Sequence, residues 1–135
     1  DNPKEAEAVM RERRRLEAVL HPIIRRVTER EAASAPPDAV IVFDVPLLAE
    51  SPSWRERVDR VLVVDCTEDT QVRRVMARSG WTEDAVRRVI AQQATRERRR
   101  AIADAVILNE GLSLSALEQA VIAVWRGWGL PITYG

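Results

Sequence analysis

Two short, continuous runs of apolar residues limit most strongly what this chain can fold into. Residues 39–45 read AVIVFDV, and residues 60–65 read RVLVVD. Apolar runs of this length, rich in β-branched side chains, are typical of strands that are buried on both faces, as in a parallel sheet. A third and weaker run, AVIL, occupies residues 105–108. We therefore expect three parallel strands at these positions.

Helical patterns precede the first run. Asn2 followed by Pro3 predicts a helix start, because asparagine caps helices well and proline suits the first helical position. Pro22 lacks the N–H that a helix interior requires. We therefore expect one helix up to about residue 20 and a second one over about residues 22–34.

Further helical patterns lie between and after the apolar runs. One helix is expected to start at Thr67 or Glu68 and to run to about residue 78, and Thr82 can cap another that runs to about residue 103. A last one begins near Ser115, whose spacing to Glu118 matches a capping box. Strands that alternate with helices predict an open α/β sheet. Ligands of such folds bind beyond the carboxyl ends of the strands.

The composition argues against several classes of protein. Basic and acidic residues number 21 each, so the formal net charge is zero, unlike that of a general nucleic-acid binder. Cys66 and His21 are the only cysteine and histidine, so neither an intrachain disulfide nor a multi-histidine metal site is expected. No apolar run approaches the ~20 residues of a membrane span. With no signal peptide visible, the expected location is cytoplasmic.

Several short motifs follow one another in a specific order. They are HP at 21–22, DVPLLAE at 44–50, VLVVD at 61–65, AQQ at 91–93 and ADAVILNEG at 103–111. In this order and at these spacings they resemble the dephospho-coenzyme A kinases, over roughly residues 14–130. The resemblance implies a P-loop NTPase-type fold, a three-layer α/β/α parallel sheet with helical coenzyme-binding and lid regions.

One part of the family pattern is missing. Members of this family begin with a strand and a G-x-x-x-x-G-K-S/T loop, which holds the ATP phosphates and Mg²⁺. None of the five glycines here precedes a lysine. We therefore expect a chain truncated at its N-terminus, a sheet without its first strand and with an exposed or collapsed centre, and no activity of the chain alone.

The resemblance also implies a division of labour within one domain fragment, residues 1–135. Residues 1–35 are expected on the acceptor side, 38–66 and 104–135 in the sheet core, and 67–103 in lid helices. The implied reaction is transfer of the γ-phosphoryl group of ATP, with Mg²⁺, to the ribose 3′-hydroxyl of dephospho-coenzyme A, the last step of coenzyme A synthesis. ATP and dephospho-coenzyme A are thus the expected partners, without nucleic acid or a membrane.

Four arginines are candidate phosphate contacts, because guanidinium groups match phosphate oxygens. Arg78 precedes Ser79-Gly80-Trp81, a predicted hinge into the lid. Arg78 and Arg99 are the expected catalytic contacts, and Arg74 and Arg96 are expected to bind ATP. The alternative for each arginine is a solvated charge on a helix surface.

The strand ends supply the remaining candidates. Asn109 and Gly111 are expected to bind ATP, with a simple turn as the alternative, and Asp44 is the candidate Mg²⁺ ligand. We expect Asp44, Arg78 and Asn109 to share one cleft, whereas Asp65 and Asp104 are expected to cap helices or to pair with arginines. The expected acceptor-binding residues are His21, Pro46, Leu47, Leu48 and Glu50.

Two other functions remain open at this point. The first is a different small P-loop kinase for a nucleoside or sugar, because lids and parallel sheets are common to that group. The second is a non-enzymatic, arginine-rich RNA-binding adaptor built around residues 85–100. The HP and DVPLLAE motifs favour the coenzyme A branch, and the zero net charge disfavours RNA binding.

Overall fold

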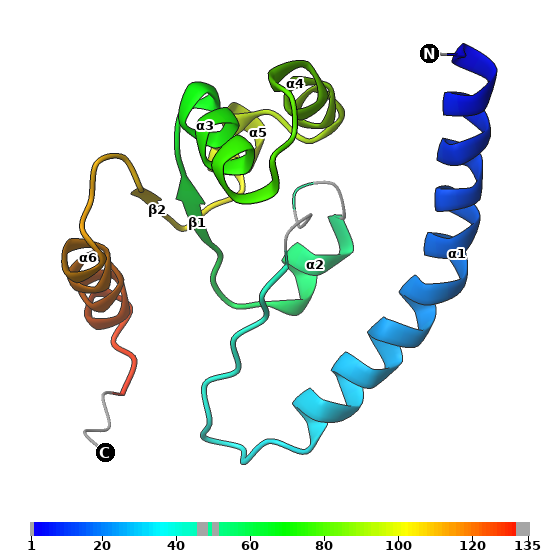
Figure 1. The fold of residues 1–135 in the computed structure, drawn as a ribbon. Helices are drawn as coiled ribbons and strands as arrows, with labels where there is room; N and C mark the ends of the chain where they lie inside the picture. Colours follow the sequence, from blue (N-terminus) through cyan, green and yellow to red (C-terminus); the bar gives the residue numbers. More distant parts are fainter. Residues whose placement is uncertain (1, 46–48, 50–51, 132–135) are drawn as a thin grey trace. The chain divides into compact units, whose positions relative to one another are not determined.

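The computed structural model describes residues 2–45, 49 and 52–131, in two compact units whose boundary along the chain lies between residues 43 and 44. The first unit contains helix α1, Pro3–Ala33, which runs through Pro22 without interruption and curves along its length (Figure 1). The Asn2 side chain caps it by accepting a hydrogen bond from the N–H of Lys4 at 3.0 Å.

The prediction of two helices separated at Pro22 was therefore wrong. Proline removes one hydrogen bond from the helix, but strong helix formers on both sides of Pro22 propagate the rest. Although α1 is 31 residues long, neither it nor another helix in the described part of the chain is apolar enough to cross a membrane.

The prediction of a strand over residues 39–45 was also wrong. The only strands among the described residues are β1 (Leu62–Asp65) and β2 (Ala105–Leu108), and residues 39–45 pair with neither. A strand requires a neighbour that satisfies its backbone N–H and C=O groups. Without one, this apolar run has no regular secondary structure, and Val42 is 76% exposed.

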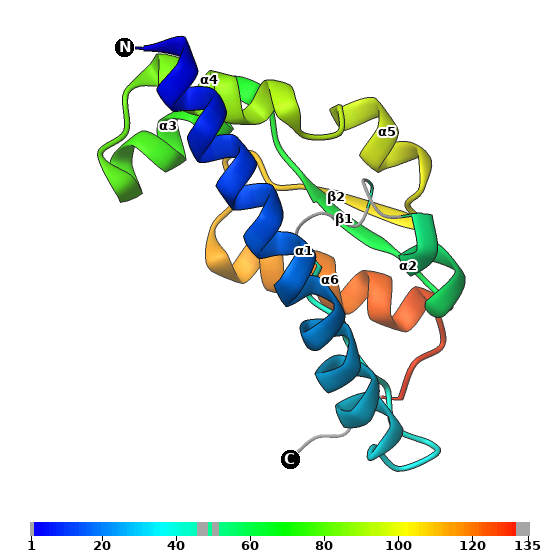
Figure 2. The same cartoon turned by 90° about the vertical axis from the view of Figure 1, so that its right-hand side faces the viewer.

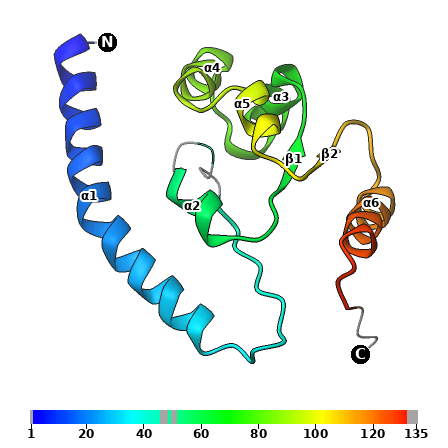
Figure 3. The ribbon, with the colours of Figure 1, turned by 180° about the vertical axis from the view of Figure 1, so that it is seen from behind.

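The second unit is built around β1 and β2, which pair in parallel with Leu62 opposite Ala105 and Asp65 opposite Leu108. Its helices are α2 (Pro52–Arg57), α3 (Glu68–Ser79), α4 (Glu83–Gln92), α5 (Arg96–Ala101) and α6 (Leu114–Gly127). The crossover from β1 to β2 passes through α3, α4 and α5 (Figure 3). Helix α5 packs against β1 and α6 against β2, on opposite sides of the strand pair (Figure 2).

The core of this unit is small. Its buried apolar residues are Val61, Val72, Val86, Ala94 and Ile107. The strands were expected to be buried on both faces, yet Val64 and Leu108 are each more than half exposed. The fold is thus a mostly helical α/β arrangement with a two-stranded parallel sheet.

Threonine caps define the crossover helices. Thr67 and Thr82 cap α3 and α4, as the sequence predicts. The helix expected over residues 82–103 is divided in two, because Gln93 adopts an extended backbone and the Thr95 side chain accepts from a backbone N–H of α5 and starts that helix. Local capping chemistry here outweighs the continuous helical pattern.

The last helix begins slightly earlier than expected. Ser113, not Ser115, caps α6, with its hydroxyl accepting from the N–H of Ala116 at 3.0 Å. The two serines lie only two positions apart, and the backbone conformation decides which one caps the helix. Ser113 has φ −67° and ψ 162°, which leaves its side chain free to turn back onto the first helical turn.

Gly80 ends α3 in a left-handed conformation, with φ 67° and its N–H donating to the carbonyl of Met76. A Cβ at Gly80 meets no atom within 4 Å, so the cost of Gly80→Ala is conformational, about 1 kcal/mol of unfolding free energy. Gly127→Ala is the matched control, because Gly127 is helical and equally uncrowded; we expect it to be neutral or stabilising. Urea unfolding of both variants checks this, and equal effects would contradict it.

Candidate functional site

Asp65 stands at the carboxyl end of β1 and is 4% exposed. The first residue of α5, Arg96, donates from Nε to Oδ1 at 3.0 Å and from Nη2 to Oδ2 at 2.8 Å. These hydrogen bonds lower the pKa of the Asp65 carboxyl, although burial acts in the opposite direction. The Thr95 cap places Arg96 where it can reach Asp65, so the ion pair ties α5 to the strand end.

Asp104 makes a second arginine pair, next to the start of β2. Its Oδ2 accepts from the backbone N–H of Val61 at 2.6 Å, and Arg55 of α2 donates to Oδ1 at 3.3 Å. The carboxylate therefore joins α2 to the amino ends of both strands. The prediction that Asp65 and Asp104 cap or pair with arginines is confirmed.

Glu110 links the loop after β2 to the start of α3. One carboxylate oxygen accepts from the backbone N–H of Thr67, and the other accepts from the Thr70 hydroxyl at 2.7 Å. These bonds lower the pKa of the Glu110 carboxyl to about 2. The amino end of α3, where an external anion would otherwise be favoured, is thus occupied by a carboxylate of the chain itself.

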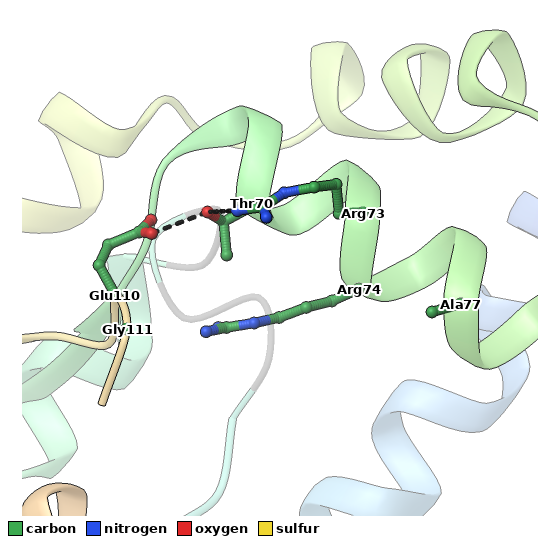
Figure 4. Close-up of a pocket in the computed structure, with 6 residues that line it drawn as sticks. All are labelled: Thr70, Arg73, Arg74, Ala77, Glu110 and Gly111. Carbon is green, nitrogen blue, oxygen red and sulfur yellow. Dashed lines mark hydrogen bonds between the residues drawn. The ribbon is translucent and has the colours of Figure 1, made fainter. Parts of the chain in front are cut away.

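An open depression of about 340 Å³ lies beside this link. It is lined by Thr70, Arg73, Arg74, Ala77, Glu110 and Gly111 (Figure 4). From α3, Arg74 extends toward the loop and donates from Nη2 to the carbonyl of Asn109 at 2.9 Å. Gly111 has φ 61°, a conformation that glycine adopts without strain. The depression therefore has arginines on one side and a short polar loop on the other.

The structure brings together three of the predicted ATP-binding residues, Arg74, Asn109 and Gly111. The fourth, Arg96, is engaged with Asp65 at the end of the neighbouring strand. Arg99 is half-buried on α5, and Arg78 is exposed at the end of α3. Neither Arg99 nor Arg78 lines the depression, so their phosphate contacts stay predictions.

The remaining predicted residues lie apart from the depression or outside the described part of the chain. Asp44 is exposed and does not line the depression. Within the described ranges, no group of three or more acidic, histidine or cysteine side chains fits a metal ion. His21 is exposed on α1, in the first unit. The other acceptor-side residues, Pro46, Leu47, Leu48 and Glu50, lie outside the described residues.

Sequence analysis missed Glu110 and its partner Thr70. Glu110 lies within the ADAVILNEG motif, and Thr67 was recognised only as a helix cap. Only the register of the two strands could have linked these residues, and the sequence does not reveal it. Because Asp65 lies opposite Leu108, residues 67 and 110 each lie two positions beyond the end of their strand. In a parallel pair such residues meet at the same edge of the sheet.

The β1–helix–β2 arrangement, with polar and arginine side chains beyond the carboxyl ends of parallel strands, is that of open α/β proteins at their ligand sites. The sequence profile of one family, described as dephospho-CoA kinase, matches residues 6–114. The chain belongs to the dephospho-CoA kinase family.

Individual relatives agree with this assignment. The dephospho-CoA kinase of Albidiferax ferrireducens is 53% identical over 120 residues, which are 87% of this chain and 57% of the relative. That of Burkholderia thailandensis is 53% identical over 112 residues, 83% of this chain and 55% of the relative. The chain thus spans about half the length of the curated relatives it matches.

A solved structure shows the same fold. The crystal structure of TT1252 from Thermus thermophilus has a TM-score of 0.68 and 36% sequence identity to this chain. The similarity covers 94% of this chain and 61% of that one. The two-stranded unit and its helices therefore correspond to part of a larger known structure.

Proposed function

We propose that this chain carries the nucleotide-side and acceptor-side parts of a kinase that phosphorylates the ribose 3′-hydroxyl of dephospho-CoA with ATP, the last step of coenzyme A synthesis. The supporting observation is the contact of Arg74 with Asn109, beside Gly111 and beyond the carboxyl ends of two parallel strands. Open α/β folds of many kinds bind ligands at this position, and membership of the dephospho-CoA kinase family supports ATP and dephospho-CoA as the ligands here.

The chemistry of phosphoryl transfer suits such a site. Transfer in line between two oxygens needs little covalent participation by the protein and depends on positioning and on stabilisation of charge. Arg74 presents a planar donor group next to the loop, and Asn109 presents an amide that can read an adenine edge. In this proposal the adenosine part of ATP lies over the 109–111 loop, while Mg²⁺ accompanies the phosphates.

The other roles in the proposal follow the division of the chain. Arg78 and Arg99 contact the phosphates from the lid, residues 67–103, and Arg96 combines its structural ion pair with ATP binding. His21 and residues 46–50 serve the acceptor, and Asp44 is the candidate Mg²⁺ ligand. A cytoplasmic location belongs to the same proposal.

A chimera tests this function. In it, the chain replaces the matching part of the Burkholderia thailandensis relative, with which it shares 53% identity over 112 residues. We expect ATP-dependent phosphorylation of dephospho-CoA by the chimera, and none by the 135-residue chain alone, because the chain contains no G-x-x-x-x-G-K-S/T loop. A coupled assay of ADP release measures both.

The parent enzyme is the positive control, and AMP and gluconate are the comparison acceptors. A folded chimera that phosphorylates gluconate or AMP in preference to dephospho-CoA would assign the chain to another kinase group. Turnover by the isolated chain would show that it needs no further phosphate-binding loop.

A further inference from the structure

The loop between β2 and α6 is held in place at three points. Glu110 binds the amino end of α3 through both carboxylate oxygens. The carbonyl of Asn109 accepts from Arg74, and its N–H donates to the carbonyl of Asp65 at 2.7 Å. Of these contacts, only those of Glu110 are made by a side chain of the loop itself. Its conformation therefore depends on Glu110 more than on its other side chains.

Thr70, the partner of Glu110, has no spare capacity for hydrogen bonding. Thr70 is 4% exposed, and its hydroxyl donates a hydrogen bond to Glu110. The same oxygen accepts from Nη2 of Arg73 at 2.9 Å and from the hydroxyl of Thr67 at 3.0 Å. One donor and two acceptor sites are all that a hydroxyl offers. The network thus fixes the direction from which Glu110 must approach.

Charge reinforces this geometry. Glu110 lies at the positive end of the α3 dipole, and the hydrogen bonds that it accepts lower the pKa of its carboxyl to about 2 and so favour the ionised form. Hydrogen bonds to an ionised acceptor are stronger than those between neutral groups. The link is therefore intact wherever the protein is studied near neutral pH.

We propose that Glu110 is a positioning residue for the adenine nucleotide: it holds Asn109 and Gly111 in place opposite Arg74, so that the loop meets the nucleotide already ordered. This inference rests on the proposed function, since it concerns the same depression. A loop that is ordered before binding loses less conformational entropy on binding, and the affinity is higher.

Nucleotide binding by the 135-residue chain tests the proposal. AMP carries the adenosine part with a single phosphate and is titrated while amide NMR shifts of residues 109–111 are followed. We expect Glu110→Gln to weaken AMP binding about tenfold, because the amide cannot accept both bonds. Glu118→Gln removes the same charge from an exposed position of α6 and is expected to leave the affinity unchanged.

A second pair of variants separates positioning from general stability. Thr70→Val keeps the shape but removes the hydroxyl, and it should weaken AMP binding as Glu110→Gln does, without further loss in the double variant. Thr70→Ser restores the hydroxyl and should restore the affinity. Hydrogen exchange should accelerate in the 109–113 loop of Glu110→Gln and stay unchanged in α4.

The outcomes are distinct. If wild type shows no saturable AMP shift in the loop, the proposed function fails at this site. If wild type binds but Glu110→Gln and Thr70→Val bind equally well, the positioning role is wrong while the function stands. Faster exchange throughout the unit, with no recovery in Thr70→Ser, would reduce Glu110 to a general stabilising residue and overturn the proposal.

Discussion

Replacing Arg96 by methionine is expected to lower the midpoint of thermal unfolding of this chain by about 10 °C. The Asp65 side chain is 2% exposed, and Arg96 donates a hydrogen bond to each of its two carboxylate oxygens. Removal of one member of such a pair leaves an uncompensated charge in the protein interior, which costs far more than loss of a surface ion pair. Calorimetry or circular dichroism measures the shift.

Two further variants identify the cause. Adding Asp65→Asn to Arg96→Met removes the stranded charge and should recover much of the loss, whereas a purely local effect of Arg96 on α5 would not be recovered. Arg98→Met changes an exposed arginine of the same helix and should alter the midpoint little. A similar shift for Arg98→Met and Arg96→Met would contradict the assignment.

The loss of stability caused by Arg96→Met should also depend on pH. The pKa of Asp65 is lowered in the folded state, so its pairing adds stability above the unfolded pKa of about 4. That stability is lost as the pH falls from about 4 through the folded-state pKa. The difference between wild type and Arg96→Met should therefore be full near neutral pH and shrink below about pH 4. A difference that is constant from pH 7 to pH 3 would be evidence against the buried pair.

The second large effect concerns catalysis. In the chimera described above, Arg78→Ala is expected to lower kcat at least about 100-fold, the usual result of removing a group that stabilises charge in the transition state. Arg78 precedes Gly80, whose φ of 67° marks a change of direction between α3 and α4. The expected loss rests on the proposed contact of the Arg78 guanidinium with the phosphates.

Arg78→Lys is the informative second variant. It keeps the charge but loses the planar fork, so an intermediate kcat would indicate contact with phosphate oxygens. Arg88→Ala removes an exposed arginine of α4 and serves as the matched control, with kcat expected within about twofold of the parent. If Arg78→Ala behaves like Arg88→Ala, Arg78 is a solvated helix charge and has no role in transfer.

Much of the local structure was readable from the residues. Thr67 and Thr82 indicate the starts of α3 and α4, and the apolar runs at 60–65 and 105–108 contain β1 and β2. Such features depend on neighbouring residues, through side-chain caps and side-chain periodicity. The family, too, was evident in the order of short motifs, and the matching profile confirms it.

Other features depended on partners distant in the chain. The run at 39–45 has the composition of a strand, yet it pairs with no described segment and therefore forms no strand. Pro22 favours a helix end, but cooperative hydrogen bonding on both sides carries α1 past it. In both cases the hydrogen-bond partners decided the outcome against the local preference. The apolar run had no partner strand in the part of the chain that the structure describes, and the helix around Pro22 had its other hydrogen bonds.

By itself the sequence determined the family, the caps of α1, α3 and α4, two of the strands and the arginine-rich character of the site, but not the caps of α5 and α6. The tertiary structure alone decided which polar side chains meet: Asp65 with Arg96, and Glu110 with Thr70 at the start of α3. These contacts join residues 31 and 40 positions apart. The first depends on the packing of α5 against β1, and the second on the parallel register that places Asp65 opposite Leu108. Register is set by packing of the whole sheet, which no local pattern encodes.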